Sequence, residues 1–494
     1  MFANGNRPAT ASRLRTRPVP LCIEPLEYRR LLSGNVLQTN LVSDLPGVAA
    51  TQDPQLVNPW GIASSSGSPF WVSDNNAGVS TLYNTAGTKQ GLVVNIPAPG
   101  GDPLAADGTP TGVVFNIDGG ATGGFKVSAN GKGPASPAFL FATEDGTILG
   151  WAPAVDGTHA IIIPALNNSG NNFTEPDPRL QTGAVYKGLA IAAGTGGAPI
   201  ASTDPKSTFL LYATNFRSGQ VEVYDPDFST ATLPAGAFTD TALPKGYAPF
   251  DIQVLGNKVF VTYAKQDKLE HDDDAGPGNG FVDVFNLDGT PGLAGGNERL
   301  ASRGALNSPW GLAIAPASFG SLAGDLLVGN FGDGLINVFD PTTGASQGQL
   351  TDPDGEPIQI DGLWALRVGN GGNGGDANKV YFTAGLFGES HGLFGSLTPV
   401  DAGTPEGPAE AQMAQAALDV AQINLITLQN DIANNVSQSQ FIQDRQALQS
   451  SVVDLIHVNH DLNQDIVSDG GTATSNAIDA FLDELRALRR DLHL

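Results

Sequence analysis

The chain has very little cysteine and comparatively few basic residues. Cys22 is the only cysteine among 494 residues, so neither an internal disulfide nor a metal site built on several cysteines is possible within the chain. Lys and Arg number 25 against 50 Asp and Glu, which gives a formal net charge of −25. Nucleic acid is therefore not expected as a partner, because its phosphates are neutralised by Lys and Arg. No uninterrupted run of about 18 apolar residues occurs, so no membrane insertion is expected.

Glycine and proline are abundant instead, with 62 and 34 residues, as expected for a chain with many tight turns. Between residues 58 and 397 one pattern occurs six times. A short run containing Pro or Gly leads into an apolar strand, a second strand ends in a polar turn, and a third strand follows. Such repeats of short strands are typical of β-propellers, with one blade for each repeat. The six copies begin at residues 58, 110, 185, 248, 308 and 361.

The last repeat contains only three predicted strands, at residues 363–368, 379–384 and 391–397. One further strand, at residues 37–43, precedes the first repeat. We expect it to complete the last blade, because this closure protects the edges of the first and last sheets. The predicted fold is mainly β: a six-bladed β-propeller closed by an N-terminal strand in the last blade, followed by a small C-terminal α-helical bundle.

Composition divides the chain into four parts. Residues 1–37 form a basic tail, residues 38–398 the propeller, residues 399–407 a linker rich in Pro and Gly, and residues 408–494 a helical region. In the helical region Ala414, Leu418, Ala421, Leu425, Leu428 and Ile432 recur at helical spacing. This stripe predicts either packing within a small bundle or self-association of two chains through the C-terminal helices.

The basic tail contains a short motif that resembles a known export signal. Residues Leu26, Glu27, Tyr28 and Arg29, followed by Leu31, Leu32 and Ser33, are similar to the LEPR-XLL-type N-terminal motif of large bacterial surface and exported proteins. Tyr28 stands where that motif has Pro. The resemblance implies an exported, extracellular or cell-surface protein.

Four phrases within the repeats and one just before them resemble an uncharacterised bacterial propeller family, which is related in style to the NHL-type six-bladed propellers. The phrases occupy residues 42–47, 58–62, 263–267, 276–285 and 390–395. The resemblance covers residues 38–398 and implies the fold, and no established reaction comes with the family.

In such a ring the turn that enters each inner strand and the turn after the second strand open on one face, where loops on a rigid scaffold can bind a ligand. Carboxylates, amides and aromatic side chains mix there, which suits a carbohydrate, a peptide or a protein. The residues expected on this ligand face are Asn58, Trp60, Tyr186, Tyr247, Asn307, Trp310, Arg217, Lys265 and Glu389. The alternative is that these residues only build turns and pack between blades.

The fourth repeat carries an inserted acidic loop. Asp267, Asp272, Asp273 and Asp274 could gather around Ca²⁺, which binds oxygen ligands in variable geometry. The alternative is a solvated acidic loop over the mouth of the channel.

No catalytic motif is recognisable, and the preferred interpretation is a binding module without catalysis. The alternative is a metal-dependent, lactonase-like hydrolase or lyase. Its ion would be held in the central channel by Asp74, Glu144, Asn215 and Asn330, which end or follow second strands. His271 or His391 could then act as a general base.

Overall fold

The computed structural model describes residues 35–400 apart from residues 103, 120–122, 173, 176, 202 and 203, together with residues 409–434, 448, 452, 477, 478 and 480–482. The predicted export motif, Cys22, the linker from residue 401 onward and most of the second and third predicted helices lie outside the described residues.

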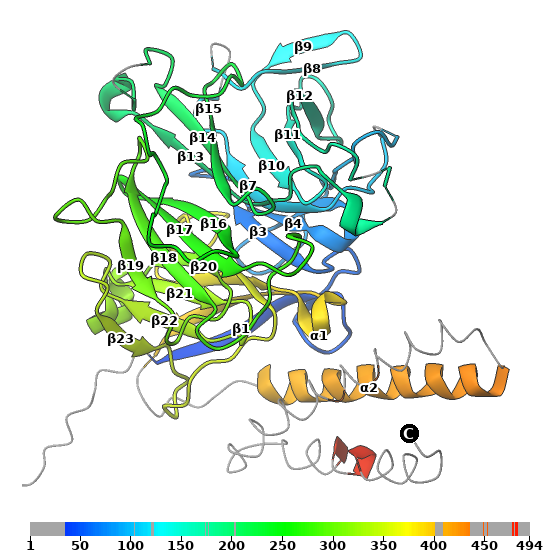
Figure 1. The fold of residues 1–494 in the computed structure, drawn as a ribbon. Coiled ribbons are helices and arrows are strands. Elements are labelled where there is room, and N and C mark those ends of the chain that lie inside the picture. The colour runs from blue at the N-terminus through cyan, green and yellow to red at the C-terminus, as the bar shows by residue number, and fades with distance from the viewer. Residues whose placement is uncertain are drawn as a thin grey trace, which may run out of the picture.

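Six sheets follow one another around a ring, as the repeats predict (Figure 1). Within each sheet the first three strands of the repeat pair antiparallel in chain order from the inside outward. The innermost strands are β3 (Pro59–Ala63), β7 (Pro110–Phe115), β13 (Tyr186–Ala193), β16 (Tyr247–Leu255), β20 (Pro309–Ile314) and β24 (Leu363–Val368). The second strands are β4 (Phe70–Asp74), β10 (Phe139–Thr143), β14 (Phe209–Asn215), β17 (Lys258–Lys265), β21 (Leu326–Asn330) and β25 (Val380–Ala384).

The outer strands complete the blades. The third strands are β5 (Val79–Tyr83), β11 (Thr147–Trp151), β15 (Gln220–Tyr224), β18 (Gly280–Asn286), β22 (Ile336–Phe339) and β26 (Leu393–Pro399). Fourth strands in blades one, two, four and five are β6 (Val94–Asn95), β12 (Ile161–Asn167), β19 (Arg299–Ser302) and β23 (Ser346–Gln349). A separate hairpin consists of β8 (Val127–Ala129) and β9 (Lys132–Ala135). Short 3₁₀ helices are η1 (Asn75–Ala77), η2 (Pro178–Leu180), η3 (Thr195–Gly197) and η4 (Ala317–Leu322).

The N-terminal strand closes the ring, as predicted. Strand β1 (Val36–Ser43) pairs antiparallel with β26, so that Val36 lies opposite Pro399 and Ser43 opposite Leu393. A short strand, β2 (Thr51–Gln52), adds to its outer edge in parallel. The first and last described segments of the propeller therefore share one sheet, which leaves neither end of the ring with an open seam.

Small residues let neighbouring inner strands approach closely. A Cβ atom added at Gly61 would lie 2.5 Å from the carbonyl oxygen of Thr111 on the next inner strand. The corresponding atom at Gly311 would lie 2.4 Å from the carbonyl oxygen of Trp364. These separations are shorter than van der Waals contact, so glycine is required where the blades meet.

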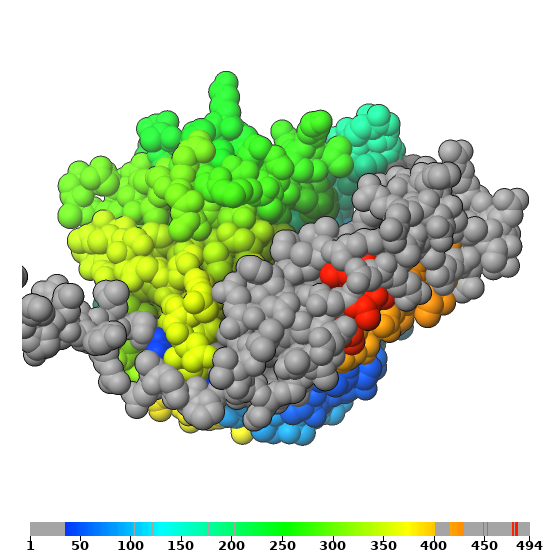
Figure 2. Space-filling model, turned by 90° about the horizontal axis from the view of Figure 1, so that it is seen from below, coloured from blue at the N-terminus to red at the C-terminus, as the bar shows by residue number. Residues whose placement is uncertain are grey.

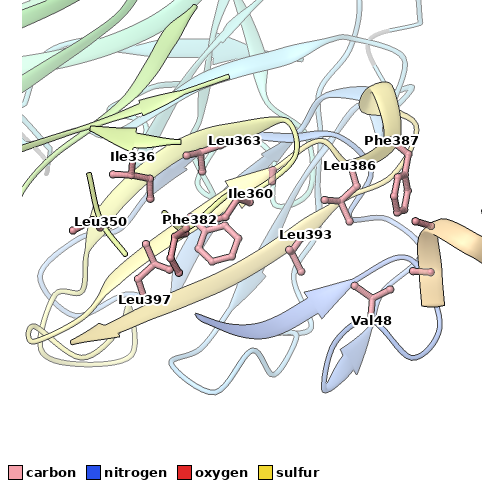
Figure 3. Packing of buried hydrophobic residues seen from close by; sticks show 14 of the residues in the cluster. Val48, Ile336, Leu350, Ile360, Leu363, Phe382, Leu386, Phe387, Leu393 and Leu397 are labelled. Carbon is pink, nitrogen blue, oxygen red and sulfur yellow. The ribbon is translucent and has the colours of Figure 1, made fainter. Parts of the chain in front are cut away.

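Helix α2 (Ala409–Asn434) packs against buried residues of the last blade and of the N-terminal strand. Figure 2 shows the helix, in orange, next to the blue N-terminal part of the propeller. Leu418, Ala421 and Leu425 are buried in one cluster with Val36 and Val48. Figure 3 shows the propeller side of this cluster running from Leu350 and Leu397 to Val48, Leu386 and Phe387. The described part of the apolar stripe thus packs onto the propeller of the same chain. No helix in the described part of the chain is long and apolar enough to cross a bilayer.

Candidate functional site

Both sets of predicted loops open on one face of the ring. The register pairs the first residue of each inner strand with the last residues of its second strand, as in Pro59 with Asp74 and Pro309 with Asn330. The turn that enters an inner strand therefore lies beside the turn that leaves the second strand. We call this face the loop face.

Each inner strand carries a bulge near its entrance, at the same place in the repeat. A bulge re-aims side chains that would otherwise follow the pleat. The first bulged residue directly follows the last residue that is paired before the bulge. These six equivalent residues are Trp60, Thr111, Lys187, Phe250, Trp310 and Trp364.

Aromatic rings from this set fill the middle of the propeller. Trp60 and Trp364 stack with ring centroids 3.5 Å apart. Trp310 lies edge-on to both rings, at 6.1 Å from Trp60 and 5.7 Å from Trp364. Phe331 also stacks on Trp364, with ring centroids 4.0 Å apart. The rings form an apolar floor below the loop face.

Lys187 is the one charged residue among the six equivalents, and its ammonium group is held on this floor. The side chain is 1% exposed, and Nζ lies 4.9 Å above the Trp60 ring, within the range of a cation–π contact. Nζ donates to Glu144 Oε1 and lies 3.2 Å from Asp272 Oδ1. Burial lowers the pKa of Lys187, but the two adjacent carboxylates raise it by a larger amount. The net pKa therefore lies above the usual lysine value.

Residues from four blades meet at this ammonium. Glu144 follows β10 of the second blade and accepts a hydrogen bond of 2.9 Å from Asn75 of the first blade. Lys187 belongs to the third blade, and Asp272 belongs to the inserted loop of the fourth. His271 Nδ1 lies 3.0 Å from Asp272 Oδ1. One possible ligand atom each from Glu144, His271 and Asp272 lies within 4.8 Å of the other two.

A second polar group crosses the seam between the last and first blades. Asn58 donates to Glu389 Oε2 at 2.7 Å and accepts from Trp364 Nε1 at 3.0 Å. Burial raises the pKa of Glu389 to about 7, and the negative charge of Glu144 acts in the same direction. Asn58 has a φ of 47° and Glu389 a φ of 67°, a left-handed conformation that costs energy in residues other than glycine.

Glu389 ends helix α1 (Leu386–Glu389), which follows β25 of the last blade. Its contact with Asn58 places the Glu389 carboxyl, whose pKa is about 7, near Lys187, Glu144 and Asp272. Strained backbone conformations and perturbed pKa values each cluster at functional sites, and both occur here.

Hydrogen bonds fix the inserted loop of the fourth blade over the aromatic floor, and its acidic residues contact different partners. Gln266 Nε2 donates to the carbonyl oxygen of Phe216 at 2.7 Å, and the amide of Gly276 donates to Asn307 Oδ1 at 2.6 Å. Asp274 pairs with Lys265, while Asp267 accepts backbone amides of its own loop.

The fourth acidic residue of that loop is Asp273. Burial raises its pKa to about 6. Of the four acidic residues predicted as one calcium cluster, Asp272 is the one in contact with the Lys187 group.

The four residues predicted to hold an ion in the channel do not gather at one point either. Asp74 is buried and accepts from the Thr81 hydroxyl at 2.7 Å within its own blade. Asn215 donates to Glu222 at 2.8 Å, and Asn330 donates to Asp333 at 2.9 Å. Each of these three ends its second strand, whereas Glu144 follows one residue later. Neighbouring residues of a strand point to opposite faces, so only Glu144 of this set reaches the Lys187 ammonium.

Several of the remaining predicted face residues hold the scaffold together. Tyr186 is buried and donates to Glu222 at 2.6 Å. Tyr247 donates to Asn279 at 3.1 Å, and Arg217 donates to the carbonyl oxygen of Gly183 at 2.6 Å. His391 Nδ1 lies 2.7 Å from Asp44 Oδ2. The structure therefore brings Asn58, Trp60, Trp310 and Glu389 to the centre and uses the others at the rim.

From the sequence alone no role is predicted for Lys187, Asn75 or Trp364, although the turns that contain Lys187 and Asn75 are expected on the loop face. The first bulged position of each inner strand contains the signal, since five of its six residues are uncharged and Lys187 is not. Finding it requires aligning the copies by strand register, because the phrases around Lys187 and Trp364 differ from the Pro-Trp-Gly copies.

No protein family model matches the chain. Uncharacterized protein L690 of Acanthamoeba polyphaga mimivirus is 32% identical over 364 residues, which cover 72% of this chain and 84% of that protein. Uncharacterized protein R648 of the same virus is 31% identical over 361 residues, covering 72% of this chain and 78% of that protein.

Solved structures resemble the chain only distantly. The α-L-arabinanase of Penicillium chrysogenum, solved with arabinobiose, has a TM-score of 0.40 at 12% identity and covers 74% of this chain and 98% of its own. A streptogramin B lyase has a TM-score of 0.38 at 11% identity, with coverage of 74% and 97%. The assignment as a six-bladed propeller rests on the sheet topology itself.

Proposed function

We propose that this chain, which belongs to the same protein family as the mimivirus proteins L690 and R648, is a ligand-binding propeller whose site is the centre of the loop face. The observation that carries the proposal is the buried ammonium of Lys187, held by Glu144 and Asp272 above an aromatic floor. A charged network of this kind costs desolvation energy that a purely structural plug of apolar side chains would avoid.

The surroundings favour a polar, uncharged or cationic ligand, such as a carbohydrate or a basic peptide. Carboxylates outnumber cations around the site, since Glu144, Asp272 and Glu389 face one lysine. Carboxylate and amide oxygens accept hydrogen bonds from hydroxyl or amino groups, and a tryptophan ring offers a flat face to a sugar or a cation. A strongly anionic ligand would be repelled by this group and by the overall charge of −25.

Binding to glycan and peptide arrays, followed by calorimetry on the hits, tests this proposal. We expect Asn58→Ala to weaken binding of a hit at least tenfold, and Glu389→Gln to weaken it measurably. Lys206→Ala is the matched control, because Lys206 precedes β14 and forms an exposed ion pair with Asp227 at the opposite face. A hit that binds equally to all four proteins, or tighter binding to an anionic ligand, contradicts the proposal.

A second candidate is acid–base catalysis, as in a lactonase-like hydrolase or a lyase. It is favoured by Glu389, whose pKa of about 7 suits a proton donor near neutral pH. Glu144 is paired with Lys187 and His271 lies beside Asp272, so a base and a neutral acid share one site. Turnover of lactones or glycosides that disappears in Glu389→Gln and falls above pH 7 would support catalysis. Blank assays on soluble, correctly folded protein favour the binding module.

We also propose export of the protein, on the strength of the motif at residues 26–33. Fusion of residues 1–37 to a reporter enzyme in a bacterial host tests it, with Leu31→Asp and Leu32→Asp together as the control. Retention of the reporter inside the cell would contradict the proposal.

A further inference from the structure

Lys187 stands where its neighbours could otherwise hold a metal ion. Glu144, His271 and Asp272 each present one ligand atom within 4.8 Å of the others. Two carboxylate oxygens and an imidazole nitrogen form a typical ligand set for zinc or another first-row divalent ion. The Lys187 ammonium bonds to both carboxylates of this set.

We propose that Lys187 is a built-in cation that takes the place of a divalent metal ion in a site formed by Glu144, His271 and Asp272. A buried charge needs a compensating partner, and here the buried Lys187 ammonium lies between Glu144, which is 12% exposed, and Asp272, which is 64% exposed. The lysine is fixed by its blade, by the aromatic floor and by both carboxylates, and it is 1% exposed. The natural site therefore works without a divalent ion, whatever ligand it binds.

The equivalent residue in another repeat indicates which substitution could remove the Lys187 ammonium. In the second blade Thr111 occupies the place that Lys187 occupies in the third, and its side chain is fully buried. Threonine is thus a residue that the inner ring already accommodates there. Lys187→Thr removes the ammonium and most of the side chain, and leaves Glu144, His271 and Asp272 unchanged.

Zinc titration of the full chain tests the inference, by calorimetry and by thermal unfolding. We expect Lys187→Thr to bind one zinc equivalent more than the native protein, and to unfold at a higher temperature when zinc is present. Lys187→Thr combined with Glu144→Gln should lose at least tenfold in zinc affinity relative to Lys187→Thr alone. Calcium should bind the variant more weakly, because it prefers oxygen ligands to imidazole. The native protein provides the baseline for zinc bound by other histidines.

Four results would overturn the inference. The native protein could bind the additional zinc equivalent as tightly as Lys187→Thr does. The variant could fold and gain no zinc, or its gain could survive Glu144→Gln. If Lys187→Thr is insoluble, Lys187→Ala is refolded with and without zinc, and failure to fold in both conditions counts against the inference. None of these outcomes depends on the ligand of the loop face.

Discussion

The indole Nε1 of Trp364 lies 3.0 Å from Oδ1 of Asn58, across 306 residues of sequence. The bond joins the last inner strand to the residue that enters the first one, so it spans the seam of the ring. The other end of the same amide holds Glu389. One small side chain therefore links ring closure to the candidate site.

Replacing that amide should destabilise the protein. Asn58→Ala leaves the Trp364 indole and the Glu389 carboxyl without their partner, and a buried group that loses its hydrogen bond costs about 1–3 kcal/mol. Urea unfolding measures the change. Asn378→Ala is the control, because Asn378 is exposed and its side chain bonds only to Asp376 of its own loop; its effect should stay within about 0.5 kcal/mol. Equal effects of the two variants would contradict the assigned role.

The contact between inner strands should be intolerant of a single added methyl group. A Cβ atom at Gly112 would lie 2.5 Å from the backbone nitrogen of Leu189, and backbone cannot move aside as a flexible side chain can. We expect Gly112→Ala to cost about 1–3 kcal/mol through overpacking, measured by thermal or urea unfolding. Gly67→Ala is the matched control, because no atom lies within 4 Å of its added Cβ. A neutral Gly112→Ala would show that the blades can separate at this point.

The fold could be predicted from the sequence because the same local pattern occurs six times. Each copy contains its own turns and apolar strands, so the strand positions follow without knowledge of distant contacts. The role of the closing strand could be predicted from the number of strands, because the last repeat lacks a fourth strand and one predicted strand precedes the first repeat. The pairing of β1 with β26 confirms it.

The site could be predicted only in part, for two physical reasons. Alternation along a strand decides which of two neighbours faces the centre, and the sequence does not show where each bulge falls. Asp74 and Glu144 were therefore grouped, although they point to different places. The contact of Asp272 with Lys187 depends on the path of one inserted loop, and no repeat provides a template for that path.

The ionisation of Glu389 should make stability depend on pH. Its pKa is raised to about 7 in the folded protein, mainly by burial, against about 4.3 in an unfolded chain. The folded state therefore holds its proton more tightly, and this contribution is complete below about pH 4 and lost as pH rises through 7. The loss amounts to at most about 4 kcal/mol, at roughly 1.4 kcal/mol for each unit.

Glu389→Gln isolates this contribution, because glutamine keeps the shape and cannot ionise. We expect the unfolding free energy of the native protein, relative to that of the variant, to fall between pH 5 and pH 8. Chemical denaturation at several pH values measures the difference. Other buried carboxyls, such as Asp283 with a pKa of about 7, cancel in the comparison. Parallel pH curves for the two proteins would contradict the assignment.

Closure by β1 should be required for the cooperative unfolding of the whole ring. Val42 of this strand is fully buried and lies opposite Phe394 in the last blade. Val42→Asp would bury a charge without a partner in the described surroundings, a change expected to cost roughly 3–5 kcal/mol. Thr39→Asp is the matched control, because Thr39 lies on the same strand and is exposed; its effect should be within about 0.5 kcal/mol.

Deleting residues 35–45 applies the same test to the complete strand. The last blade would then expose the edge of β26, and the interface between the first and last blades would lose its outer support. We expect unfolding at a lower temperature, with a broader transition because the blades no longer act as one closed ring. A synthetic peptide of residues 35–45, added to the deletion variant, should restore a sharp transition, because the vacated edge offers the same backbone donors and acceptors. A deletion variant that unfolds as sharply and at the same temperature as the full chain would show that the ring holds without this strand.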